Sequence, residues 1–176
     1  MQLSLVNNEK KIYLADTSAL IGLEVIFPKK NKTFTAIWEE IEDLILNGQF
    51  KIIDYVEDEI NNYEGDHTFL KRWVHEFKKE LVVKTDEYAY NAAIQIINQE
   101  YYTGFFDPKK QAEGKEEADP YLIAYCKVHE WTLITNESKI KSNKIPAVAK
   151  KHSVNCININ DFLNERGLRM ERKSSS

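Results

Sequence analysis

The sequence predicts an α/β fold in which helices cover both faces of a central parallel β-sheet, a three-layer α/β/α sandwich. Two observations support this prediction. Short apolar segments alternate along the chain with longer amphipathic segments, as in chains that build parallel sheets. The short segments are also apolar throughout, without alternating polar residues, which is typical of strands buried on both faces.

The strands are identified as apolar runs that end at polar or turn-forming residues. The first, I-Y-L-A, is followed at once by Asp16, and the second, K-I-I-D-Y, follows Asn47-Gly48. We predict strands at 12–15, 51–55, 132–135 and 154–159, and we allow a further short strand at 81–83.

The helices are identified by apolar residues at helical spacing and by residues that begin or end helices. The segment 34–46 carries one apolar stripe and ends at Asn47-Gly48, while Asp119-Pro120 begins another helix with proline in its first turn. The predicted helices cover 17–26, 34–46, 56–63, a segment containing 69–77, then 86–102, 119–129, 146–152 and 161–166. The charged segment 104–117 is predicted to be a mobile loop.

Length and composition predict one globular domain. The chain has 176 residues, 43% of them hydrophobic and 30% charged, which is ordinary for a soluble protein with a real core. We expect an N-terminal extension at 1–11, the domain at 12–166 and a disordered tail at 167–176. The chain shows no apolar run long enough to span a membrane and no signal peptide, so we expect a cytoplasmic protein.

Cysteine and histidine do not indicate a metal centre. Cys126 and Cys156 lie far apart in apolar surroundings, and we interpret them as reduced core thiols. The histidines lack the paired spacing of zinc ligands, so a zinc site is not expected.

The charge is distributed unevenly. The net charge of −4 does not by itself indicate a nucleic-acid-binding protein, but between Ser138 and Val154 there are five lysines and no acid. Lys139, Lys141 and Lys144 begin this run and are our candidates for contacts with phosphates of a nucleic acid. That they are ordinary solvated lysines is an equally good interpretation for each of them.

Four acidic residues follow predicted strands or begin predicted helices: Asp16, Glu59, Asp119 and Glu137. In a parallel sheet the carboxyl ends of strands and the amino ends of helices lie along one edge, where sites form. Each acid also has a simpler interpretation, because Asp16 and Asp119 could be helix caps and the two glutamates could be surface residues. Taken together, they are expected to share one pocket.

Carboxylates brought together in this way require a cation or protonation. Two carboxylates about 6 Å apart repel each other by roughly 3 kcal/mol at an effective dielectric constant near 20. A divalent cation removes this repulsion, and a site made only of oxygen ligands suits Mg²⁺ or Mn²⁺. The four acids therefore predict a divalent-metal site.

The four acids and the order of strands and helices between them resemble the PIN-domain nucleases. The resemblance extends from about Ile12 to Phe162, and it implies that the acids bind Mg²⁺ or Mn²⁺. It further implies that a water activated there attacks a phosphodiester bond of RNA. Ser18 and Thr135 match small hydroxyl residues that orient a carboxylate or a metal-bound water, and a local capping bond is an equally good interpretation of each. Glu137 departs from the pattern, since aspartate is more common there, and this puts a second metal ion in doubt.

The resemblance also implies a biological setting. Many small single-domain PIN proteins are toxins of toxin–antitoxin pairs, so an RNA substrate, an antitoxin protein and a homodimer are the partners it implies. The alternative is a catalytically weak PIN-like module that binds nucleic acid or a protein partner. A phosphohydrolase of another doubly wound class is less favoured, because Asp16 is followed by Thr17-Ser18 and not by the D-x-D pattern that such enzymes use.

Overall fold

Five parallel strands form the centre of the molecule in the order β3-β2-β1-β4-β5. The computed structural model describes residues 10–112 and 117–168. The strands are β1 (Tyr13–Ala15), β2 (Phe50–Ile53), β3 (Val82–Val83), β4 (Thr132–Ile134) and β5 (Cys156–Ile157). β1, at the middle of the sheet, is wholly buried, as its continuous apolar sequence requires.

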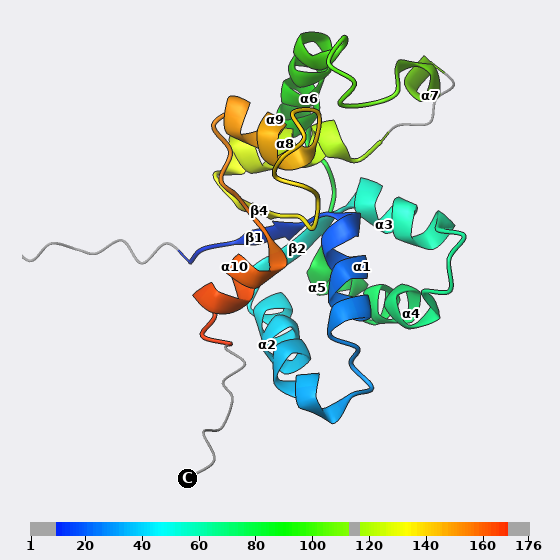
Figure 1. The fold of residues 1–176 in the computed structure, drawn as a ribbon, viewed down its shortest axis with the longest axis vertical. Coiled ribbons are helices and arrows are strands. Elements are labelled where there is room, and N and C mark those ends of the chain that lie inside the picture. The colour runs from blue at the N-terminus through cyan, green and yellow to red at the C-terminus, as the bar shows by residue number, and fades with distance from the viewer. Residues whose placement is uncertain (1–9, 113–116, 169–176) are drawn as a thin grey trace, which may run out of the picture.

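The order of the strands explains why helices cover both faces. The chain adds β2 and β3 on one side of β1, and it then crosses back to add β4 and β5 on the other side. Because such crossovers are right-handed, the connections made in opposite directions lie on opposite faces of the sheet. Figure 1 shows α6, α8 and α9 on one face, and α1, α2, α4 and α10 on the other.

The helices of the first half of the chain, with their bounds, are α1 (Thr17–Ile26), the short 3₁₀ turn η1 (Lys32–Phe34), α2 (Thr35–Leu46), α3 (Asp54–Asn62), α4 (Thr68–Glu76) and α5 (Lys78–Leu81). Those of the second half are α6 (Glu87–Glu100), α7 (Pro108–Ala112), α8 (Asp119–His129), α9 (Ile145–Lys151) and α10 (Ile159–Glu165). The predicted fold class, an α/β/α sandwich with a central parallel β-sheet, is confirmed.

Two tryptophans fix α2 and α4 against each other. The rings of Trp38 and Trp73 meet edge to face at 5.3 Å, and both side chains are buried. Their indole N–H groups are satisfied, since Trp38 donates to the Phe27 carbonyl at 2.6 Å and Trp73 donates to Glu42 at 2.8 Å. This packing fixes the positions of α2 and α4 on one face of the sheet.

Several predicted bounds were wrong, each for a local reason. The segment 104–117, predicted to be a loop, contains the helix α7. The second strand ends at Ile53, because Asp54 begins α3 and accepts hydrogen bonds from Thr85. The last strand is shorter than predicted because Asn158 caps α10 with a capping box. The helix predicted around 69–77 is divided into α4 and α5 at Phe77.

Most of the predicted N-terminal extension and of the predicted disordered tail lies outside the described residues. Within the described residues, no helix is both long enough and apolar enough to cross a membrane.

Candidate acidic site

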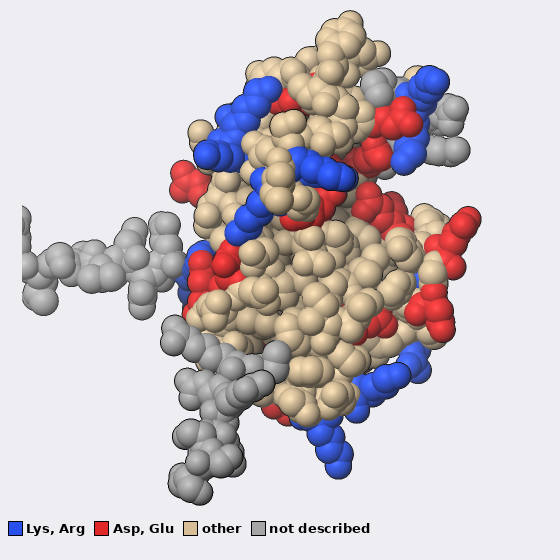
Figure 2. Space-filling model, viewed as in Figure 1, with Lys and Arg blue, Asp and Glu red and all other residues tan. Residues whose placement is uncertain are grey.

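A pocket of about 520 Å³ opens at the carboxyl edge of the sheet. All four predicted acids, Asp16, Glu59, Asp119 and Glu137, line it. They come from four elements that are distant in the sequence, namely the starts of α1 and α8, the helix α3 and the loop after β4. Figure 2 shows acidic side chains gathering on this face where the upper helices meet α3.

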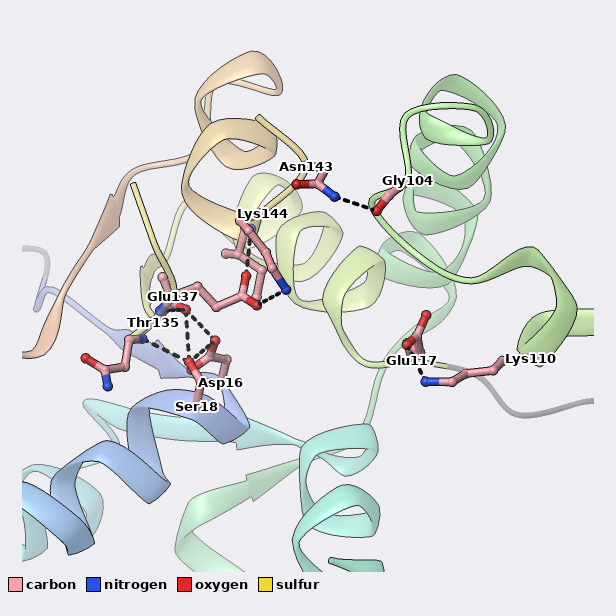
Figure 3. Close-up of polar contacts among 11 residues, drawn as sticks. Asp16, Ser18, Gly104, Lys110, Glu117, Thr135, Glu137, Asn143 and Lys144 are labelled. Carbon is pink, nitrogen blue, oxygen red and sulfur yellow. Dashed lines mark hydrogen bonds and ion pairs between the residues drawn. The ribbon is translucent and has the colours of Figure 1, made fainter. Parts of the chain in front are cut away.

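Asp16 is placed by the pairing of β1 with β4. Ala15 lies opposite Ile134 in the register, so the next residues, Asp16 and Thr135, emerge side by side. The Thr135 hydroxyl donates to Asp16, and the Ser18 hydroxyl donates to it at 2.9 Å (Figure 3). The Ala19 backbone N–H donates at 2.6 Å, so Asp16 also caps α1. Asp16 is therefore both the expected helix cap and a residue of the expected acidic site.

The carboxylate of Asp16 is buried, and no positively charged side chain in the described part of the chain pairs with it. Asp16 is 3% exposed, and burial raises the pKa of its carboxyl group to about 7. The hydrogen bonds from Thr135, Ala19 and Ser18 act in the opposite direction and lower this pKa. The donors are all neutral groups, so they do not balance the charge. Nearby Glu137 raises the pKa further.

Asp119 is the least compensated of the four acids. It is the first residue of α8, and within the described part of the chain its carboxylate accepts no hydrogen bond and forms no ion pair. Burial raises its pKa well above the usual value, and the charges of Glu137, Asp16 and Glu59 raise it further. This position therefore favours either a proton or a cation.

The two glutamates are held by donors of the protein. Glu59 accepts hydrogen bonds from the Thr17 hydroxyl and, at 3.0 Å, from the Ala118 backbone N–H. Glu137 forms an ion pair with Lys144 at 2.8 Å and accepts the Ile145 N–H at 2.9 Å, so both of its oxygens are occupied (Figure 3). Among the described residues, no three acidic, histidine or cysteine side chains stand close enough together to hold a metal ion.

The small hydroxyl residues join the walls of the pocket. Ser18 and Thr135 lie 3.2 Å apart and both bond to Asp16. Ser18 also accepts the Asn136 N–H, and Thr135 accepts the Glu137 N–H, which fixes the loop after β4. Ser18 and Thr135 are therefore placed to orient the carboxylate of Asp16, and this role remains a prediction.

The candidate lysines are mostly paired with acids. Lys139 pairs with Asp161 at 2.9 Å and Lys144 pairs with Glu137, so neither is free to bind phosphate as the structure stands. Lys141 is exposed and pairs with no acid in the described part of the chain. The run of lysines in the sequence correctly predicts positive charge beside Glu137. It does not predict that Lys139 and Lys144 pair with acidic side chains.

Glu116 and Glu117 lie just before Asp119 in the sequence, where either could offer another carboxylate to the site. Glu117 pairs with Lys110 at 3.1 Å and accepts the Asp107 N–H at 2.8 Å, so its carboxylate is already engaged. Glu116 lies outside the described residues.

Gly22 was not identified from the sequence as part of the site. A Cβ atom there would lie 2.8 Å from the Asn136 side-chain nitrogen and 2.8 Å from Ile159. The absence of a side chain therefore allows α1 to approach the loop that carries Glu137. An isolated glycine inside a predicted helix is the signal that could have identified this contact.

The model of one protein family, described as a domain of unknown function (DUF4411), matches residues 13–170. No curated protein matches the sequence. Among solved structures, PAE2754 from Pyrobaculum aerophilum is similar with a TM-score of 0.51 at 12% identity, covering 90% of this chain and 98% of that one. This likeness shows a shared fold.

Two further solved structures have lower scores. FitAB bound to an IR36 DNA fragment is 17% identical, with a TM-score of 0.47, and the match covers 93% of this chain and 100% of that one. FitAcB from Neisseria gonorrhoeae is 20% identical, also with a TM-score of 0.47, over 84% of this chain and 97% of that one.

Proposed function

We propose that this chain, which belongs to the DUF4411 family, is a metal-dependent endoribonuclease that hydrolyses phosphodiester bonds of RNA. One observation carries the proposal: acids from four separate elements line one pocket, and neither the buried Asp16 nor the half-buried Asp119 has a cationic partner among the described residues. A protein that needed these acids only as helix caps would have no reason to place all four in one pocket.

The chemistry of the donors fits Mg²⁺ or Mn²⁺. Asp16 and Asp119 offer oxygen ligands in a pocket of unbalanced negative charge, and they are the residues that would hold the ion. When bound, the ion would neutralise the pocket and supply positive charge to a phosphodiester under attack by water. Glu59 and Glu137 line the same pocket and would add their negative charge to it.

The other residues of the pocket position these ligands. Ser18 and Thr135 donate to Asp16 and limit its rotation, so its carboxylate is oriented before any ligand arrives. Lys144 holds Glu137 toward α9 and partly balances its charge. The resemblance to PIN domains adds the toxin of a toxin–antitoxin pair as the proposed biological role, with an antitoxin protein and a homodimer as proposed partners.

A second candidate function is a catalytically weak module that binds nucleic acid or a protein. The engaged oxygens of Asp16, Glu59 and Glu137 favour it, because both oxygens of each of these carboxylates already accept hydrogen bonds from the protein. The two candidates differ in metal binding, which the nuclease needs and the module does not.

The test compares cleavage with metal binding. Purified protein is incubated with mixed RNA and with single-stranded DNA, in Mn²⁺ or in EDTA, beside an Asp16→Asn variant. We expect cleavage of RNA in Mn²⁺ only and a Mn²⁺-dependent rise of the melting temperature, both lost in the variant. Asp58→Asn, at an exposed acid beside Glu59, is the matched control and should behave as wild type. Mn²⁺ binding without cleavage, or cleavage that survives EDTA, would reject the proposal.

A further inference from the structure

A second hollow adjoins the acidic pocket beside α1 and α4. Its volume is about 410 Å³. Its lining includes Glu24, Val25, Lys30, Asp66, His67 and Arg72. Val25 lines both this hollow and the acidic pocket, so the two meet at the last turn of α1.

The surface between the two hollows is apolar. Val25, Ile26 and Tyr63 all line the acidic pocket and are 65%, 50% and 43% exposed. Large apolar side chains exposed together beside a polar site indicate a binding surface. The Tyr63 ring lies edge-on to the ring of His67, with 5.1 Å between centroids, and His67 lines the second hollow. An apolar and aromatic surface thus connects the two hollows.

The far side of the second hollow carries positive charge. Lys30 and Arg72 are exposed there, and neither forms an ion pair with a residue in the described part of the chain. Of the two acids in the hollow, Glu24 is engaged by His67 at 2.5 Å, and Asp66 accepts a hydrogen bond from Thr68 at 3.1 Å. Ammonium and guanidinium groups without acid partners are suited to binding phosphate.

We infer that a single nucleic-acid strand lies along this path, from the acidic pocket over Val25, Ile26 and Tyr63 to Lys30 and Arg72. The inference rests on the proposed function, since it places the scissile phosphate at the acids. Unstacked bases gain from contact with aromatic and aliphatic side chains, whereas the bases of a duplex are hidden within its stack. Phosphates beyond these bases would meet the two cations. The path therefore selects single strands that extend past the cleaved bond.

Binding tests the path separately from cleavage. Fluorescently labelled RNA of twelve nucleotides, single-stranded or duplex, is titrated in EDTA against the Asp16→Asn protein, and the anisotropy is measured at several salt concentrations. Adding Lys30→Gln and Arg72→Gln should weaken single-strand binding about tenfold and lower the log–log salt slope by roughly 0.7 for each lost contact. Tyr63→Ala should weaken binding about tenfold with the salt slope unchanged, because stacking involves no counterion release.

The control is the pair Lys79→Gln and Lys127→Gln, two exposed lysines that line neither hollow, and it should leave both affinity and slope unchanged. Unchanged affinity and slope in the Lys30 and Arg72 double variant, or equal affinity for duplex and single strand, would overturn the path. Hydrolysis of bis(p-nitrophenyl) phosphate by the wild-type protein with Mn²⁺ is measured in parallel. Its absence would count against the proposed nuclease while leaving the binding result to decide the path.

Discussion

Two buried carboxylates of this protein have opposite electrostatic surroundings. Glu100, at the end of α6, is 2% exposed, and Asp16, at the start of α1, is 3% exposed. Burial raises the pKa of both, but at Glu100 the hydrogen bonds from Lys151 and His152 outweigh it, and the pKa is lowered. The pKa of Asp16 rises to about 7. Two carboxylates with similarly low exposure therefore have pKa values shifted in opposite directions.

The carboxylates of Glu100 and Asp16 differ in the charge of the groups that contact them. Glu100 pairs with Lys151 at 2.6 Å and with His152 at 3.0 Å, so α6 and α9 are joined by a compensated charge. Asp16 has neutral donors and other acids around it. A compensated buried charge serves the fold, whereas an uncompensated one costs stability and is kept where a ligand balances it. We therefore interpret Glu100 as a structural acid and propose that Asp16 is a functional one.

The largest expected effect is on cleavage. Asp16→Asn and Asp119→Asn should each lower the Mn²⁺-dependent cleavage rate about 100-fold or more, because each removes a ligand and a charge from the pocket. Without metal, the same variants should melt at the same or a higher temperature, because a buried repulsive charge is gone. Cleavage assays and thermal unfolding measure the two effects. Unchanged cleavage in either variant would exclude that residue from catalysis.

Glu100→Gln should show the opposite pattern. We expect a loss of about 2 kcal/mol in the free energy of unfolding at pH 7, because the buried ion pair is broken. The cleavage rate per folded molecule should equal that of wild type. Urea unfolding measures the loss, with Glu76→Gln, at an exposed acid on α4, as the control. A variant as stable as wild type would show that the pair contributes nothing.

The stability contribution of Glu100 should also depend on pH. Its pKa is lowered in the folded state, so its contribution is present above the ordinary glutamate value of 4.5 and is lost as pH falls through the folded-state value. Wild type and Glu100→Gln should therefore converge in stability in acid. Unfolding curves at pH 7 and below pH 4.5 provide the measurement, and a constant difference between the two proteins would contradict the assignment.

Glu137→Gln should reduce cleavage less than Asp16→Asn does, by about tenfold. Both of its oxygens are engaged by Lys144 and the Ile145 N–H, and a glutamine retains one acceptor for them. The ratio of the two cleavage rates under identical Mn²⁺ concentration is the measurement. A loss as large as that of Asp16→Asn would show that Glu137 turns from Lys144 and binds the metal directly.

The smallest effect concerns the lysine run. Replacing Lys139, Lys141 and Lys144 by glutamine should weaken RNA binding and flatten its salt dependence. Since Lys139 and Lys144 are paired with acids, we expect Lys141→Gln alone to produce most of the change, roughly 0.7 in the log–log salt slope. Anisotropy titrations of the single and triple variants measure it. A slope equal to wild type in the triple variant would identify ordinary solvated lysines.

The sequence is sufficient to predict the fold and which acids meet. Helices α1 and α8 begin and end at the predicted residues, because Asp16 and Asp119-Pro120 mark their starts and the strands beside them are continuous apolar runs. The meeting of the acids follows from topology, since parallel strands deliver their carboxyl ends to one edge.

The sequence does not predict which protein donors each acidic side chain of the pocket contacts. Lys144 and Glu137 are seven residues apart with a loop between them, and Thr17 meets Glu59 across two helices. Such contacts depend on packing that no periodicity encodes. The helix α7 was missed for a related reason, because its charged sequence has no apolar stripe to indicate a helix.

The hydrogen bond between Thr135 and Asp16 joins residues 119 positions apart in the chain. The acidic pocket therefore cannot be complete in a nascent chain that has not yet passed β4, because Asn136 and Glu137, which line it, and Thr135, which bonds to Asp16, have still to be synthesised. Loop closure of this length is slow compared with the formation of local helices. A ribosome making this protein would thus carry an inert chain until late in translation, whatever activity the completed domain has.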